Sequence, residues 1–290
     1  MKPLLLSRGL TAVVLLGAHT GPADAETVAE AAPDKSVYNL FHPTPRPLLR
    51  EMSTDRPDKT ESPYTVDAGH FQLEMDLVTY AYDRSGPDTE AWSVAPVNLK
   101  LGLWNNVDLQ VVLEPFNQVR VTGPMTGSRK TRSGFGDVTT RLKVNLWGND
   151  GGPTALALMP FAVFPSGQDG VGGGAFGGGL IVPLAVELPR GWSMVVMTET
   201  DFLRGDEDPD YQALFVNSIT FGHDLVGKLA GYVEFFSEVS TERDARWVGT
   251  VDLGLTYGLT ENLQLDAGIN IGVTKSADDL NPFVGLSWRF

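Results

Sequence analysis

The feature that most constrains the fold of this chain is a two-residue alternation of apolar and polar side chains across residues 70–290. In the clearest stretch, Leu263 to Val273, every odd-numbered residue is apolar and every even-numbered residue is polar or glycine. Successive side chains of a β-strand point to opposite faces, so the alternation predicts strands with one apolar face. The same pattern recurs in residues 71–77, 137–146 and 251–257.

The lengths of the alternating segments separate a membrane fold from a soluble one. Twelve segments can be counted, and most have 10 to 14 residues. Soluble strands average about 5–6 residues, whereas a tilted strand that crosses a bilayer needs about 9–11. An all-β fold is therefore predicted, an antiparallel transmembrane β-barrel of about twelve strands, with ten or fourteen strands as alternatives. The segments are residues 70–82, 91–103, 107–118, 134–147, 153–165, 175–188, 191–204, 210–222, 228–240, 246–258, 262–274 and 281–290.

The connections between the segments alternate in length as well. Those after even-numbered segments are short, such as Pro189-Arg190, and most of the others are longer and polar, such as residues 120–133. Outer-membrane barrels have short periplasmic turns and longer outer loops. An even strand count then places both ends of the predicted barrel, residues 70–290, on the periplasmic side.

The first 25 residues have the layout of a secretory signal peptide. Lys2 and Arg8 give a positive start, residues 10–18 form a short apolar run, and Ala23-Asp24-Ala25 gives an A-x-A cleavage site. The alternative is a buried N-terminal helix. A signal peptide over residues 1–25 predicts export, and the strand pattern then predicts the bacterial outer membrane as the destination.

Residues 26–69 form a separate, proline-rich segment. Proline fixes φ and lacks an amide donor, so neither a helix nor a strand ladder can continue through such a stretch. An extended conformation is predicted, either as a solvated periplasmic linker or as an ordered segment that inserts into the barrel or caps it. The residues that would form such a plug are Asp55, Arg56, Pro57, Asp58, Lys59 and Glu61.

If the apolar faces contact lipid, the alternate residues face the lumen, and their charges are twelve acids against four bases. Charges inside a narrow barrel must be paired or hydrated. We therefore expect Arg56 and Lys59 to enter the lumen and neutralise part of the acidic excess. The candidate lumen and selectivity residues are Glu74, Asp76, Lys100, Asp108, Glu114, Asp137, Arg141, Lys143, Glu199, Glu234, Glu238, Asp252, Asp266 and Arg289, and the other two acids are Glu187 and Asp201.

Other positions of the inward-facing set are apolar, mainly in the fifth to eighth segments. They either fill the barrel by packing or form an apolar wall along which an aromatic solute slides. A barrel of eight strands is filled by side chains and one of 16–18 strands is open, so twelve strands leave both possibilities. The residues are Val78, Tyr80, Tyr82, Ala157, Met159, Phe161, Ile181, Val195, Met197, Leu214 and Val216.

Composition excludes several classes of function. A net charge of -14 argues against nucleic acid as a partner, and the lack of cysteine excludes disulfides and thiolate ligands. The mean hydropathy of -0.07 excludes a bundle of membrane helices. Gly172, Gly174 and Gly177 match G-x-G-x-x-G but lie before a strand instead of opening a helix. No metal site or cofactor is predicted. No catalytic spacing is found either, since no histidine has a serine two residues away and no spacing singles out two of the lumen carboxylates.

The last segment carries an assembly signal. Val284, Leu286, Trp288 and Phe290 share one face, and the chain ends on that phenylalanine. This ending resembles the C-terminal signature that the barrel-assembly machinery reads in bacterial outer-membrane proteins, with Trp288 and Phe290 as the signal residues. Outer-membrane lipid and lipopolysaccharide are the further expected partners.

Three stretches carry a resemblance to a known family. They are residues 53–66 with 69–74 (STDRPDKTESPYTV and GHFQLE), residues 134–143 (GFGDVTTRLK) and residues 257–265 (YGLTENLQL). Over residues 53–290 the chain resembles the family named "putative MetA-pathway of phenol degradation". The resemblance implies an outer-membrane barrel and passage of aromatic or other hydrophobic compounds. It assigns no catalytic or binding residues.

The predicted function is passive uptake of a small solute through the barrel lumen, without enzymatic activity, cofactor or nucleic acid. The alternatives are a non-conducting structural or adhesion barrel, an outer-membrane hydrolase, and a soluble secreted β-sandwich. The sequence leaves the solute and the oligomeric state undecided.

Overall fold

The computed structural model describes residues 34–290 except 124–126, 169 and 205–209. The chain divides into two units, of which the second, Pro33–Phe290, is described below. The predicted signal peptide, residues 1–25, lies outside the described residues. No helix among the described residues is long and apolar enough to cross a membrane.

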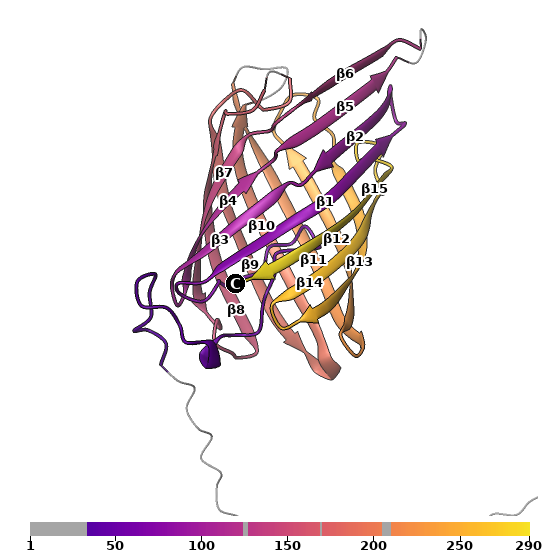
Figure 1. Cartoon of the computed structure of the whole chain (residues 1–290). Coiled ribbons are helices and arrows are strands. Elements are labelled where there is room, and N and C mark those ends of the chain that lie inside the picture. Colours follow the sequence, from indigo (N-terminus) through magenta and orange to yellow (C-terminus); the bar gives the residue numbers. More distant parts are fainter. Residues whose placement is uncertain (1–33, 124–126, 169, 205–209) are drawn as a thin grey trace, which may run out of the picture. The chain divides into compact units, whose positions relative to one another are not determined.

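The second unit is built from one antiparallel sheet, which the pairing of β15 with β1 closes into a barrel (Figure 1). Two short 3-10 helices, η1 (Arg46–Leu48) and η2 (Pro189–Gly191), complete the described part. The strands are β1 (Phe71–Asp83), β2 (Asp88–Val94), β3 (Val97–Trp104), β4 (Val107–Leu113), β5 (Phe116–Thr122), β6 (Arg129–Gly134), β7 (Val138–Trp147), β8 (Thr154–Phe164), β9 (Gly177–Leu188), β10 (Trp192–Arg204), β11 (Tyr211–Val226), β12 (Leu229–Ser240), β13 (Val248–Thr260), β14 (Leu263–Gly272) and β15 (Leu280–Arg289).

Three pairs of these strands are halves of single barrel strands. β1 pairs with β3 along its first half and with β2 along its second, so β2 and β3 follow one another along the same neighbour. The breaks between halves contain Pro96, with Ala95 at φ +56°, and Pro115, neither of which can donate a ladder hydrogen bond. The third break, between β6 and β7, spans residues 135–137. Counting each pair once gives the twelve-stranded antiparallel barrel that the alternation predicted, which is confirmed.

The two ends of the barrel differ in their connections. One end, called the turn end below, has short turns such as the two residues between Val226 and Leu229, where Gly227 adopts φ +60°. At the other, loop end, the prediction of a polar loop over residues 120–133 is wrong in part. β5 and β6 continue the ladder there to Thr122 and from Arg129, and Arg120 forms an ion pair with Glu90 of β2 at 3.0 Å.

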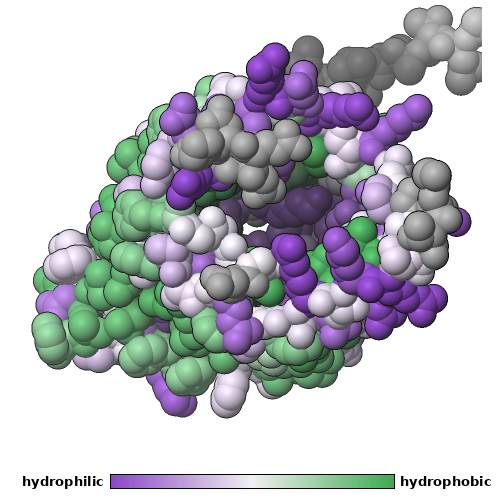
Figure 2. Space-filling view, turned by 90° about the horizontal axis from the view of Figure 1, so that it is seen from above, coloured by the Kyte–Doolittle hydropathy of each residue, from purple (hydrophilic) through white to green (hydrophobic). Residues whose placement is uncertain are grey.

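The apolar face of the strands forms the outer wall. Leu253, Leu255 and Trp288 are 43%, 47% and 50% exposed, whereas Asp252 and Ser287, which neighbour them in sequence, are buried inside. Viewed from the loop end, the molecule is hollowed at its centre, with hydrophilic residues around the mouth and hydrophobic ones along the flank (Figure 2). This is the distribution that a lipid-facing barrel requires.

One irregularity overturns three predicted inward positions. The register of β1 against β15 shifts by one residue, with Asp76 opposite Gly285 and Val78 opposite Val284. A bulge of this kind reverses the faces of all residues beyond it. Val284 is 40% exposed on the outer wall. Every second residue of β1 from Val78 onward therefore faces outward and not into the lumen. These residues are Val78, Tyr80 and Tyr82.

Candidate functional site: the lumen and its plug

The described N-terminal segment enters the barrel at the turn end. The Leu40 amide donates to the Leu103 carbonyl at 2.8 Å, and Asn39 forms a β-bridge with Trp104. Residues 53–67 then lie against the inward side chains of most of the barrel strands, and this segment is called the plug. Its prolines suit the position, because a chain without regular structure must obtain its hydrogen bonds from wall side chains.

The first limb of the plug, which contains Asp55, lies in a buried charge network. Asp55 accepts hydrogen bonds from Lys143 of β7 at 2.6 Å and from Lys100 of β3. Lys100 also contacts Glu74 of β1, whose carboxylate accepts the Asp55 amide at 3.0 Å. All four side chains are at most 5% exposed. The two lysines hold the pKa of Asp55 far below its usual value, although burial acts in the opposite direction. A network so fully paired fixes the plug in one position.

Arg56 extends this network to the strands on the other side of β1. Its guanidinium contacts Asp76 at 2.9 Å and Asp266 of β14 at 2.6 Å. The space for it comes from Gly285 of β15, where an added Cβ would collide with the guanidinium group. The added Cβ would also collide with the backbone carbonyl of Met75 in β1.

The tip of the plug bonds with β11, β12 and β13. Lys59 contacts Asp252 at 3.2 Å and Thr250 at 2.9 Å, and its amide donates to Glu234 at 3.0 Å. Thr60 adds hydroxyl contacts with Ser218 at 2.6 Å and Thr220 at 2.9 Å. Both expected neutralising residues, Arg56 and Lys59, therefore contact lumen carboxylates.

Glu61 lies where the plug meets the apolar part of the wall. Its carboxylate pairs with Arg141 of β7, and its amide contacts the sulfur of Met197 at 3.3 Å. Burial raises the pKa of Glu61 to about 7, against the opposing effect of Arg141. One carboxylate oxygen and the Arg141 Nε are buried without a hydrogen-bond partner in the described structure. The plug is therefore less completely bonded here than at Asp55.

The second limb of the plug, which contains Pro63 and Val66, returns to the turn end along β4 and β7. Asn145 donates to the Pro63 carbonyl at 2.9 Å, and Asp108 accepts the Val66 amide at 2.9 Å. Asp67 is 1% exposed and contacts three bases, which are Arg50 at 3.4 Å, Arg289 at 3.5 Å and Lys35 at 3.8 Å. These contacts close the base of the plug.

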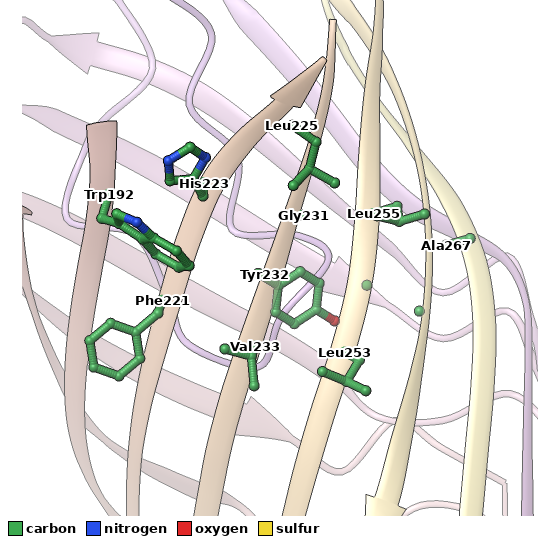
Figure 3. Close-up of a pocket in the computed structure, with 12 residues that line it drawn as sticks. Trp192, Phe221, His223, Leu225, Gly231, Tyr232, Val233, Leu253, Leu255 and Ala267 are labelled. Carbon is green, nitrogen blue, oxygen red and sulfur yellow. The ribbon is translucent and has the colours of Figure 1, made fainter. Parts of the chain in front are cut away.

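Tyr232 of β12 supports the plug from the wall. Its ring lies over Gly254 and Gly268, which leave the space that side chains would occupy, and its hydroxyl donates to the Pro57 carbonyl at 3.4 Å. Figure 3 shows Tyr232 together with the other residues that line an apolar groove of about 610 Å³ near the turn end. Trp192 and His223 meet edge to face at the rim of that groove, with ring centroids 4.7 Å apart.

Strands β8 to β11 supply a different inner wall. Met159, Ile181 and Met197 are at most 1% exposed and Val216 is 5% exposed, and Phe161, Leu214 and Phe236 pack against them. Of the two interpretations of these residues, the described structure shows side-chain packing at this depth. Next to the packed layer lies a chamber of about 710 Å³, lined by Asp58 and Pro57 of the plug and by wall residues that include Glu187, Val195 and Thr220.

Of the fourteen candidate lumen and selectivity residues, ten meet the plug or its base and four do not. Glu114 bonds to Asn117, and Asp137 accepts the amides of Gly167 and Gly173 in a loop at the loop end. Glu199 and Glu238 flank Val216 on the inner wall beside the tip of the plug. Those in contact with the plug or its base are Glu74, Asp76, Lys100, Asp108, Arg141, Lys143, Glu234, Asp252, Asp266 and Arg289.

Several residues of the site were not singled out from the sequence. Asn145, Ser218 and Thr220 occupy inward positions of alternating segments, so the same pattern could have identified them. Asp67 and Arg50 lie outside any strand, and their pairing depends on how the plug folds back. No group of residues suited to hold a metal ion occurs among the described residues.

Comparison with known proteins places this architecture. Residues 54–290 match the family described as "Putative MetA-pathway of phenol degradation". An outer membrane channel from Pseudomonas putida F1 is similar, with a TM-score of 0.55, 15% identity, and coverage of 82% of this chain and 100% of that chain. The NanC porin has a TM-score of 0.48 and 11% identity, and the match covers 74% of this chain and 98% of the porin. The TodX monoaromatic hydrocarbon channel, as a deltaS2 mutant, has a TM-score of 0.40 and 9% identity, and the match covers 76% of this chain and 88% of that channel. No curated protein sequence matches the chain.

Proposed function

This chain belongs to the family of the "Putative MetA-pathway of phenol degradation", and from that premise we propose that it is a passive outer-membrane channel for small, predominantly apolar solutes. The lipid-facing wall and the fold shared with an outer membrane channel of Pseudomonas putida F1 support the location. In that setting lipid and lipopolysaccharide surround the barrel, and Trp288 of the last strand and Phe290, which follows that strand, serve as the signal for assembly.

The unequal attachment of the plug carries the proposal. Charged and polar side chains of β1, β3, β4, β7 and β11–β14 bond the plug, whereas Met159, Ile181 and Val216 contribute only packing. A solute with an apolar body can take over packing contacts, but it cannot replace buried ion pairs. The solute therefore passes between the plug and the wall of β8–β10, and the chamber of about 710 Å³, which residues of β9–β13 and the plug line, receives it.

The charged residues of the lumen thus act mainly as plug anchors. The acids placed to meet a passing solute are Glu199, Glu238 and Glu61 beside the tip and Asp58 and Glu187 in the chamber, and they repel anions. Movement is driven by the concentration gradient. In this proposal the protein catalyses no reaction, and the lumen needs no cofactor.

Solute entry into vesicles tests the proposal. Purified protein in proteoliposomes is exposed to phenylethylene glycol and to erythritol, two polyols with and without a ring, and the rate through protein-free vesicles is subtracted. We expect protein-dependent entry of the aromatic polyol to exceed that of erythritol. Equal rates for the two would indicate an open polar pore, and no rate above the lipid background would indicate a non-conducting barrel.

A further inference from the structure

A short polar stripe crosses the predominantly apolar outer wall. Thr198 of β10 lies opposite Asn217 of β11, and Asn217 lies opposite Ser237 of β12. All three face outward, because Met197 and Ser218, their neighbours in sequence, are buried on the inner side at 1% and 4% exposure. Three polar side chains are therefore in register on a surface that faces lipid.

The stripe lies near the middle of the lipid-facing band. Asn217 is six residues from Tyr211 and four from Phe221, and Thr198 is six from Trp192 and four from Phe202. Aromatic residues of this kind mark the two interfaces of an outer-membrane barrel. Val196, Phe215 and Phe235 surround the stripe and are 37%, 43% and 40% exposed.

The Asn217 carboxamide has no hydrogen-bond partner within the part of the chain that the structure describes, and its residue is exposed. Ser237, in contrast, accepts the indole N–H of Trp247 at 2.9 Å. An amide has two donors and one acceptor oxygen, and hydrocarbon offers none of the matching groups. The lipid that covers the rest of the wall cannot satisfy this side chain.

A groove adjoins the stripe on the same wall. It has a volume of about 610 Å³, and its lining includes Val182, Leu184, Val196, Ile219 and Phe235, with Thr198 and Asn217 at the polar positions. The outward residues of β3 and β4, which belong to another part of the wall, are all apolar from Val97 to Leu113. The polar stripe and the groove therefore single out β9–β12 as a surface for a partner inside the membrane.

We propose that this surface binds a second copy of the same chain, as a dimer with a two-fold axis along the membrane normal beside Asn217. A two-fold axis brings each Asn217 to its counterpart, and a carboxamide both donates and accepts, so the two side chains satisfy one another. Phe215 and Phe235 of each copy then face the groove of the other. A different membrane protein would need its own unpaired amide at the same depth, which a second copy supplies by symmetry.

Cysteine cross-linking locates the interface, because the native chain has no cysteine. Asn217→Cys and, as the matched control, the lipid-facing Leu109→Cys of β4 (wild-type residue 37% exposed) are oxidised with iodine in native outer membranes. We expect a disulfide-linked dimer of twice the chain mass for Asn217→Cys and monomer for Leu109→Cys. Equal yields for the two, no dimer for either, or a linked product of any other mass would overturn the proposal.

A second measurement tests the role of the amide itself. Native mass spectrometry of the wild-type protein should give mainly dimer, and Asn217→Leu should lower the dimer fraction at least threefold. Retained heat-modifiable gel mobility shows that the variant has folded. A monomeric wild type would refute the dimer, and an unchanged dimer fraction in folded Asn217→Leu would refute the pairing of the two amides. Neither result depends on what the channel transports.

Discussion

The inner wall has a charged half, which contains Lys100 and Lys143, and an apolar half, which contains Met159, Ile181 and Met197. Both halves are built from alternating strands, but they contact the plug differently. In the charged half, Lys100 and Lys143 hold Asp55 among side chains that are at most 5% exposed. In the apolar half, Met197 offers a single contact to the amide of Glu61, and Met159 and Ile181 offer only packing. The difference in how the two halves hold the plug therefore lies in the inward set of residues.

The comparison shows how a barrel can be closed and still admit a solute. Removing one partner of a buried ion pair leaves the other charge buried and unpaired, which costs free energy. The charged half therefore keeps the plug in place. Packing contacts are non-directional and an apolar solute can replace them. Opening should therefore begin on the β8–β10 side, since Ser218 and Thr220 of β11 bond Thr60 of the plug.

The largest effect is expected from breaking the charged half. Lys143→Met removes one of the two lysines that bond Asp55 and should cost plug docking about 3–5 kcal/mol, the range for an uncompensated buried charge. Ionic conductance in planar bilayers should rise at least tenfold. Met159→Leu, a matched change in the apolar half, should leave conductance at the wild-type level. Equal conductance of the two variants would show that the charged half does not hold the plug.

A charge in the apolar half should act on the solute instead of on the plug. Val195 lines the chamber beside the plug. Val195→Asp places a carboxylate there that an apolar solute cannot pair, and leaving this group unpaired should weaken binding of the solute by about 1–3 kcal/mol. Entry of an aromatic solute should fall several-fold in proteoliposomes, with conductance unchanged and Val195→Ile as the control. A parallel rise in conductance would mean that this wall also anchors the plug.

A smaller effect is expected where the wall only makes room for the plug. Gly285→Ala adds a Cβ where the Arg56 guanidinium lies, and overpacking of this kind costs about 1–3 kcal/mol. Conductance should rise, but less than in Lys143→Met. Gly258→Ala is the control, because the nearest heavy atom to its added Cβ is 3.8 Å away. If the two alanine variants behave alike, Arg56 does not depend on the glycine.

The smallest effect is expected from pH. Burial raises the pKa of Glu61 from 4.5 to about 7, so docking is most favourable when Glu61 is protonated. Its contribution is complete below about pH 4.5 and is lost as the pH rises through 7. The pKa of Asp58 is also raised by burial, which adds to the same trend, whereas the lowered pKa of Asp55 acts only in stronger acid.

Conductance should therefore increase from pH 5 to pH 8 in the wild type and increase less in Glu61→Gln. The bases that face Glu61 are Arg141, Lys100 and Lys143. An equal slope for the two proteins would exclude Glu61 as the titrating group.

The alternation of the sequence predicted the strands and their faces, because one buried face fixes the register of a strand over its whole length. It failed beyond Asp76, since a single extra residue in β1 reverses the faces and nothing in the composition marks the bulge. It also identified Arg56 and Lys59 as partners of lumen acids through charge balance alone. It could not pair Asp67 with Arg50, because that contact arises only when residues 53–67 fold back on themselves.

Pinning the tip of the plug to the wall tests most directly whether a solute passes by displacing it. The hydroxyl oxygens of Thr60 and Ser218 are 2.6 Å apart, so Thr60→Cys/Ser218→Cys should form a disulfide in a chain that has no other cysteine. Entry of phenylethylene glycol into proteoliposomes is measured before and after reduction, with each single variant as a control. We predict that entry is abolished in the oxidised protein and returns on reduction, and unchanged entry in the oxidised protein would contradict displacement of the plug.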